Sequence, residues 1–112
     1  RDKDARASRS IRVAKIYIRE HYMEPIKLSD VAKEVHLNPS YFSTLFKKEV
    51  GVNFNDFLID CRLEAAKNLL RTTTLSISQI TETIGYTDTK YFSKLFVKIT
   101  GVKPSEYRRI YS

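Results

Sequence analysis

The sequence is poor in the residues that support metal, redox and membrane functions. Its 112 residues include one cysteine, two histidines, no tryptophan, three glycines and three prolines. A single cysteine cannot form an internal disulfide bond, and with only two histidines it argues against a zinc module. No apolar run approaches the roughly 18 residues that a membrane-spanning helix needs. We therefore expect no metal site, no cofactor and no membrane contact.

The composition instead indicates a packed core and a basic surface. Hydrophobic residues make up 42% of the chain, which is enough for a core and too much for a disordered protein. Twenty Lys and Arg residues against thirteen Asp and Glu residues give a formal net charge of +7. Such an excess points to a polyanionic partner, of which nucleic acid is the commonest.

The chain contains an internal repeat of about 50 residues. Residues 41–52 read YFSTLFKKEVGV and residues 91–102 read YFSKLFVKITGV, with 8 of 12 positions identical. Upstream, LSDVAKEV at 28–35 matches ISQITETI at 77–84 in pattern, at an offset of 49 rather than 50 residues. The second copy therefore has one additional residue between its two segments, and we place a turn there because turns tolerate insertions better than helices.

Each copy is predicted to form a helix, a tight turn and a second helix. The upstream segments carry apolar residues at helical spacing. Ser76 and Gln79 have the spacing of a capping box, and the helix should end at Gly85, which adopts a positive φ without strain. His36 occupies the corresponding position in the first copy, at a higher steric cost.

The second helix of each copy has its own start, stop and apolar stripe. Asn38 is the predicted N-cap in the first copy, and Thr87 or Asp88 in the second. Gly51 and Gly101 are predicted to end these helices. The apolar stripe, which we expect in the core rather than stacked on bases, consists of Phe42, Leu45, Phe46, Phe92, Leu95 and Phe96.

A long helix without Gly or Pro is predicted between the copies. About 18 residues at roughly 1.5 Å each give a rod of about 27 Å, which would hold the two units at a fixed separation. A first helix is predicted to begin at Ser10, and a short closing helix at Pro104. The resulting all-α chain divides into a solvated linker (1–9), a first helix-turn-helix subdomain (10–52), the central helix (53–71) and a second subdomain (72–112).

The second copy resembles the signature of the AraC/XylS family of bacterial transcription regulators. The resemblance rests on ITETIGY at 80–86, YFSKLF at 91–96 and GVKPSEYR at 101–108, and it covers roughly residues 10–111. It implies a DNA-binding domain of seven helices, in which two helix-turn-helix subdomains are joined by a long central helix.

Within this family, the sequence most resembles the type of DNA-binding domain found at the C-terminus of response regulators. That likeness implies a cytoplasmic, nucleoid-associated protein with an N-terminal receiver or sensor domain, with a stand-alone activator as the alternative.

Three positions depart from the family pattern. Ala is common where Thr81 lies, Ser or Thr where Lys103 lies, and Lys or Arg where Val97 lies.

The resemblance also implies which residues contact DNA. With the phenylalanines facing inward, the opposite face of each second helix can enter a major groove. The residues expected to read bases are Ser40, Ser43, Thr44 and Lys47 in the first copy, and Thr89, Lys90, Ser93, Lys94 and Val97 in the second. Asn38, Lys48 and Lys98 are expected to bind phosphates. The alternative for the lysines is an ordinary solvated face, and for Tyr41 and Tyr91 packing with the hydroxyl in solvent.

The predicted function is sequence-specific binding of double-stranded DNA to regulate transcription. The two recognition helices should enter successive major-groove segments about 34 Å apart. In the alternative, one unit reads DNA while the other contacts RNA polymerase or a partner domain. No enzyme activity is expected, because the acidic residues show no paired arrangement for acid–base catalysis. Cys61 lies on the apolar side of the predicted central helix, so we expect it to pack rather than react.

Overall fold

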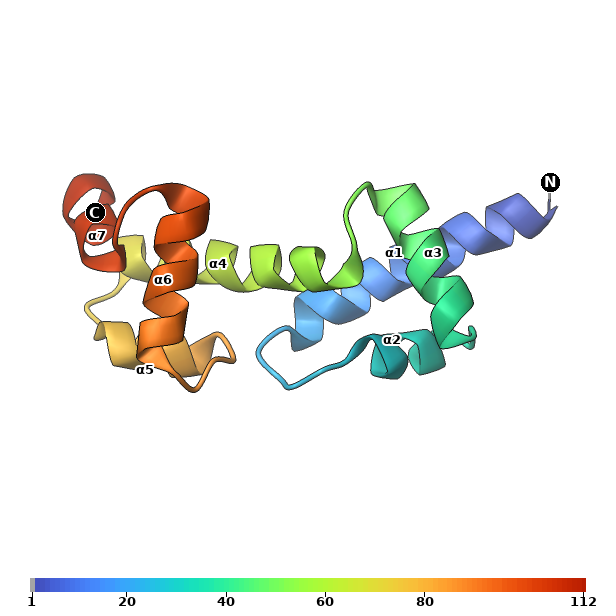
Figure 1. Ribbon diagram of the computed structural model, residues 1–112, viewed down its shortest axis with the longest axis horizontal. Helices are drawn as coiled ribbons and strands as arrows, with labels where there is room; N and C mark the ends of the chain where they lie inside the picture. The colour runs from blue at the N-terminus through green and yellow to red at the C-terminus, as the bar shows by residue number, and fades with distance from the viewer. Residues whose placement is uncertain (1) are drawn as a thin grey trace. The chain divides into compact units, whose positions relative to one another are not determined.

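The computed structural model describes residues 2–112, which form seven α-helices and no strand. The helices are α1 (Asp2–His21), α2 (Leu28–Glu34), α3 (Pro39–Val50), α4 (Phe54–Thr72), α5 (Ile77–Thr83), α6 (Thr89–Thr100) and α7 (Pro104–Tyr111) (Figure 1). This confirms the all-α prediction. The chain folds as two compact units, one ending at Cys61 and the other beginning at Arg62, so α4 contributes its first part to one unit and its second part to the other.

The first helix is longer than the sequence predicts. The sequence predicts a linker over residues 1–9, whereas α1 already begins at Asp2, and Arg1 lies outside the described residues. This segment has no apolar period, but Ala and Arg are good helix formers. Ala7 packs against the core of the first unit, and Ser8 Oγ donates a 2.6 Å hydrogen bond to Glu49 Oε1 in α3. Tertiary contacts therefore extend the helix where periodicity gave no signal.

The core of the first unit is built around two phenylalanines of α3. Phe42 and Phe46 are fully buried, with ring centroids 5.6 Å apart. Phe46 also meets Phe57 of α4 edge-on, with centroids 5.5 Å apart. α1 and α2 close the core with Ile18 and Val31, which have no exposed surface. Burial of several large side chains at about 1.5–3 kcal/mol each is what holds α2 and α3 against α1.

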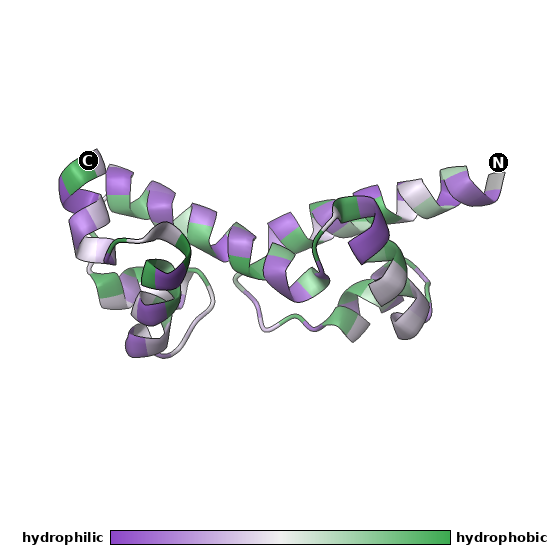
Figure 2. Ribbon diagram, turned by 45° about the horizontal axis from the view of Figure 1, so that its top comes forward, coloured by the Kyte–Doolittle hydropathy of each residue, from purple (hydrophilic) through white to green (hydrophobic). Residues whose placement is uncertain are grey.

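The second unit repeats this arrangement with α5, α6 and α7. Phe92 and Phe96 are fully buried, and the Phe96 ring meets Tyr107 of α7 edge-on, with centroids 5.6 Å apart. Leu95 is only half-buried, so the inward stripe of α6 is narrower than predicted. In Figure 2, hydrophobic and hydrophilic residues alternate along the helices, as amphipathic helices require.

Arg108 links α7 to the end of α4 by two hydrogen bonds within the second unit. Its Nε donates to the Leu70 carbonyl at 3.1 Å, and Nη2 of the same guanidinium group donates to the Thr73 carbonyl at 3.2 Å. These carbonyls lie at the end of a helix, where intrahelical partners run out. A cation at that end also complements the helix dipole.

The two tight turns have different residues at the same position, but both residues have a positive φ. Gly85 has φ 106° and His36 has φ 59°, so both adopt the left-handed conformation predicted for them. The departure at Thr81 is also accommodated. Thr81 is fully buried where the first copy has the buried Ala32, and its Oγ1 donates to the Ile77 carbonyl at 2.8 Å.

Candidate nucleic-acid interface

The two helices predicted to read DNA, α3 and α6, begin with the same pattern of capping hydrogen bonds. Asn38 Oδ1 accepts hydrogen bonds from the backbone N–H groups of Ser40 at 2.9 Å and Tyr41 at 3.3 Å. Asp88 Oδ1 accepts the equivalent pair from the second and third residues of α6, also at 2.9 and 3.3 Å. The predicted caps are confirmed, and Asp88 rather than Thr87 serves in the second copy. The two caps make the same pair of hydrogen bonds, so both helices start in the same register.

That register turns the predicted reading face of α3 away from its phenylalanines. Ser40, Thr44 and Lys47 are exposed, and Ser43 is half-buried. Thr44 Oγ1 donates to the Ser40 carbonyl at 3.2 Å, so its lone pairs and methyl group are what remain for an outside partner. This face offers short hydroxyl groups and one ammonium.

The corresponding face of α6 is more basic at its start and apolar at its end. Lys90 and Lys94 are exposed, and Thr89 and Ser93 are half-buried. Val97 is 40% exposed, on the same side of the helix. The face thus presents two ammonium groups in its first two turns and an isopropyl group in its third.

The residues predicted to bind phosphate are also exposed. Lys48 and Lys98 lie in the last turns of α3 and α6, and within residues 2–112 neither is held in an ion pair. Asn38 is exposed, but its Oδ1 is engaged in the cap, so its side-chain NH₂ group is the part left for a phosphate. Tyr41 and Tyr91 are half-exposed beside the reading faces. These roles in DNA contact remain predictions.

A groove flanks each of α3 and α6, and neither groove was predicted from the sequence. In the second unit the groove has a volume of about 420 Å³ and is lined by Ile77, Ser93, Lys94, Val97, Lys103, Pro104 and Ser105. In the first unit it has a volume of about 460 Å³ and is lined by Ile26, Lys27, Leu28, Ser43, Asn53, Phe54 and Asn55.

The repeat offset was the signal that could have found these grooves. An offset of 50 pairs Asn53, Phe54 and Asn55 with the three residues that begin α7, just as it pairs Ser43 with Ser93. Each groove is therefore bounded by α3 or α6 and by the start of the helix that follows it. In both units the groove adjoins the predicted reading face.

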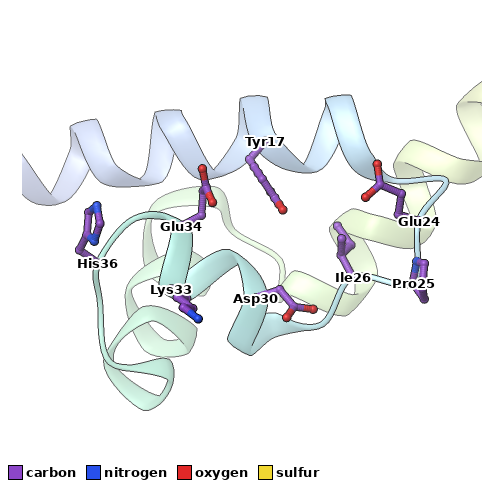
Figure 3. Close-up of a pocket in the computed structure, with 8 residues that line it drawn as sticks. All are labelled: Tyr17, Glu24, Pro25, Ile26, Asp30, Lys33, Glu34 and His36. Atoms are coloured by element: carbon purple, nitrogen blue, oxygen red, sulfur yellow. The ribbon is translucent and has the colours of Figure 1, made fainter.

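A third cavity, of about 680 Å³, lies between α1 and α2 and has the opposite charge (Figure 3). It carries the carboxylates of Glu24, Asp30 and Glu34. Asp30 accepts a 2.7 Å hydrogen bond from the Lys27 backbone N–H at the start of α2. Burial, and then the nearby carboxylates, raise the pKa of Tyr17 above its ordinary value. A cavity lined by negative charge repels phosphate, so we exclude it from the interface.

Other kinds of site find no support in the part of the chain that the structure describes. Residues 2–112 contain no group of three or more His, Cys, Asp or Glu side chains arranged to hold a metal ion. No helix described there is long and apolar enough to cross a membrane. Cys61 is half-buried, and burial raises the pKa of its thiol, which opposes formation of the reactive thiolate.

Comparison with known proteins agrees with this geometry. A family model described as a helix-turn-helix domain matches residues 31–110. The chain is 37% identical over 99 residues to the arabinose operon regulatory protein of Escherichia coli, which is 88% of this chain and 34% of the relative. The chain belongs to the AraC/XylS family. It is therefore a helix-turn-helix DNA-binding domain of the kind found in bacterial transcription regulators, and not an enzyme.

Other relatives and solved structures extend the likeness of this AraC/XylS-family domain. It is 40% identical over 95 residues to the uncharacterized transcriptional regulator YijO of Escherichia coli, covering 85% of this chain and 34% of YijO. The C-terminal domain of AraT, a response regulator from Geobacillus stearothermophilus, matches with a TM-score of 0.86 and 38% identity, over 90% of this chain and 84% of that one. The chain spans about a third of the length of the curated relatives it matches.

Proposed function

We propose that both units bind the same DNA duplex, with α3 and α6 each inserted into a major-groove segment. The observation that carries this proposal is the duplicated reading face. In each unit an N-cap of the same geometry starts a twelve-residue helix whose phenylalanines are buried and whose opposite side is polar and exposed. Such a helix fits the width of the major groove, and the net charge of +7 favours a polyanion.

The two units divide the work of recognition unequally. α3 reads its segment with Ser40, Ser43, Thr44 and Lys47, and α6 reads its segment with Thr89, Lys90, Ser93, Lys94 and Val97. Lysine donates to guanine O6 and N7, whereas hydroxyl groups discriminate less sharply between bases. Because the two faces differ in sequence, the site for one domain is not palindromic.

A base-substitution scan tests this proposal. Duplexes that bind are first selected from random DNA, and each base pair of the selected site is then replaced in turn. Two separate blocks of sensitive base pairs are the expected result. Lys94→Ala should reduce discrimination between bases, while Lys98→Ala, outside the reading face, should weaken binding to all sequences alike. Equal effects of both changes on specific and random DNA would contradict the division between reading and phosphate contact.

A second candidate function has an observation of its own. Val97 replaces, in α6, the lysine that α3 carries at Lys47, so the second reading face has lost one donor. In this alternative, one unit reads DNA and the other contacts RNA polymerase or a partner domain. A single block of sensitive base pairs in the scan would favour it over simultaneous docking.

The relatives of this domain are about three times its length, which supports partners outside residues 1–112. Two of the matching solved structures are C-terminal domains of response regulators, AraT and yesN. We infer that this domain is the cytoplasmic output part of a regulator whose receiver or sensor domain controls it. The test is whether phosphorylation or an inducer changes the DNA affinity of the full-length protein but not that of residues 1–112.

A further inference from the structure

Val97 is an exposed apolar residue on the face of α6 that is proposed to bind DNA, a charged polymer. Val97 is 40% exposed, although its neighbours on the reading face, Ser93 and Lys94, are polar. The 50-residue offset pairs it with Lys47, so the fold accepts a charged side chain at this position. A role in packing therefore does not explain the valine.

Other apolar residues lie near Val97 in the groove beside α6. Val97 lines it together with Ile77, which is half-buried, and Pro104, which is buried. The matching groove of the first unit is lined by Ser43 of α3 but not by Lys47. The second groove thus has an apolar wall that includes the recognition helix itself, with Lys94 and Lys103 also among its lining residues.

The major-groove edge of DNA offers one kind of apolar group. Thymine carries a C5-methyl group there, while the other base edges present hydrogen-bond donors and acceptors. Valine has no donor or acceptor, so the only favourable contact it can make with a base edge is with a methyl group. Facing any other base, it would cover a polar edge without pairing it, which costs free energy.

We propose that Val97 makes the second unit selective for a 5-methylpyrimidine, thymine in unmodified DNA, at the base pair that faces the third turn of α6. Val97 and the apolar wall formed by Ile77 and Pro104 enclose the methyl group, while Lys94 binds a polar edge one turn earlier. This inference rests on the proposed function, because it requires α6 to lie in the major groove.

Replacement of thymine by deoxyuridine tests the inference, because it removes the methyl group and nothing else. Each thymine of the selected site is replaced in turn, and affinity is measured by titration at fixed salt. We expect one thymine in the α6 block whose replacement weakens binding about three- to fivefold, the size expected for one buried methyl group. Exchange of that thymine–adenine pair for cytosine–guanine should also weaken binding, and 5-methylcytosine should recover a similar factor.

Two variants connect the effect to the side chain. Val97→Ala should reduce the difference between thymine and deoxyuridine, because it removes most of the side chain that contacts the methyl group, while leaving the other preferences of the block in place. Val97→Lys, which installs the residue found in α3, should shift the preference at that base pair toward guanine. Ile99→Ala is the control, because Ile99 is a 50%-exposed apolar residue of the same helix that does not line the groove, and this variant should keep the deoxyuridine effect.

The possible results distinguish a failure of this inference from a failure of the proposed DNA binding by α3 and α6. An α6 block that contains no thymine requirement, or a deoxyuridine effect of undiminished size in Val97→Ala, overturns the inference and leaves two-helix binding intact. A scan with no α6 block at all overturns both.

Discussion

At the scale of single residues, two N-cap side chains, those of Asn38 and Asp88, determine where α3 and α6 start. The Asp88 carboxylate accepts two backbone N–H groups at the start of α6. Removal of such a cap typically costs about 1 kcal/mol. We therefore expect Asp88→Ala to lower the free energy of unfolding by about 1 kcal/mol, measured by urea denaturation. Asp88→Asn, which restores the geometry that Asn38 has in α3, should recover most of the loss. A loss of the same size in both variants would mean that charge rather than capping is responsible.

Tyr86 makes the second unit sensitive to alkaline pH. Burial raises the pKa of Tyr86 above its ordinary value of about 10, and the neighbouring Arg62, 4.9 Å from the ring centroid, opposes that shift. The unfolded chain therefore loses this proton first, and above about pH 10 the unfolded state binds fewer protons than the folded state. Stability should fall as pH rises through this range.

The variant Tyr86→Phe should remove part of that fall. The measurement is the urea midpoint at several pH values from neutral to strongly alkaline, in the wild type and the variant. Tyr41→Phe is the control, because Tyr41 is 46% exposed. If the two variants change the alkaline profile equally, the buried tyrosine is not the titrating group.

The cap residues were predictable from sequence because capping is local. Asn38 and Asp88 act on N–H groups two and three residues away, so the pattern of residue types suffices. The groove beside α6 was not predictable in this way. It forms where Ile77, Val97 and Pro104 meet, and these residues belong to three different helices.

At the scale of elements, the tight turns of the two helix-turn-helix units differ in the residue that adopts a positive φ. His36 has φ 59° where the second copy has Gly85. A left-handed conformation costs a non-glycine residue about 1–2 kcal/mol, and the flexibility of glycine in the unfolded chain offsets about 0.5–1 kcal/mol of that. His36→Gly should therefore stabilise the first unit by about 0.5–1 kcal/mol. The reciprocal change, Gly85→His, should destabilise the second unit, and thermal unfolding of both variants measures the two effects.

The limits of sequence reasoning at this scale appear in α1. Apolar periodicity finds the part of the helix that packs along its length, which includes Ile11, Ala14 and Ile18 in the core. It does not find the part before Ser10, which is held by the hydrogen bond from Ser8 to Glu49, 41 residues away. A contact between distant residues leaves no periodic trace in the segment it stabilises.

At the scale of the whole molecule, the net charge of +7 predicts strong salt dependence of DNA binding. Each phosphate that the protein neutralises adds about 0.9 to the slope of log affinity against log salt concentration. If Lys48 and Lys98 each bind a phosphate, alanine at either position should reduce the slope by about 0.9, and the double variant by about 1.8. Lys33→Ala removes an equal charge from the rim of the acidic cavity and should leave the slope unchanged.

The same measurement distinguishes one docked unit from two. Lys48 belongs to the first unit and Lys98 to the second, and both are exposed at the ends of their recognition helices. Simultaneous docking makes the two reductions additive, because each lysine releases its own counterion. A slope that falls in only one of the single variants, and no further in the double variant, would assign phosphate binding to that unit alone and favour a protein partner for the other.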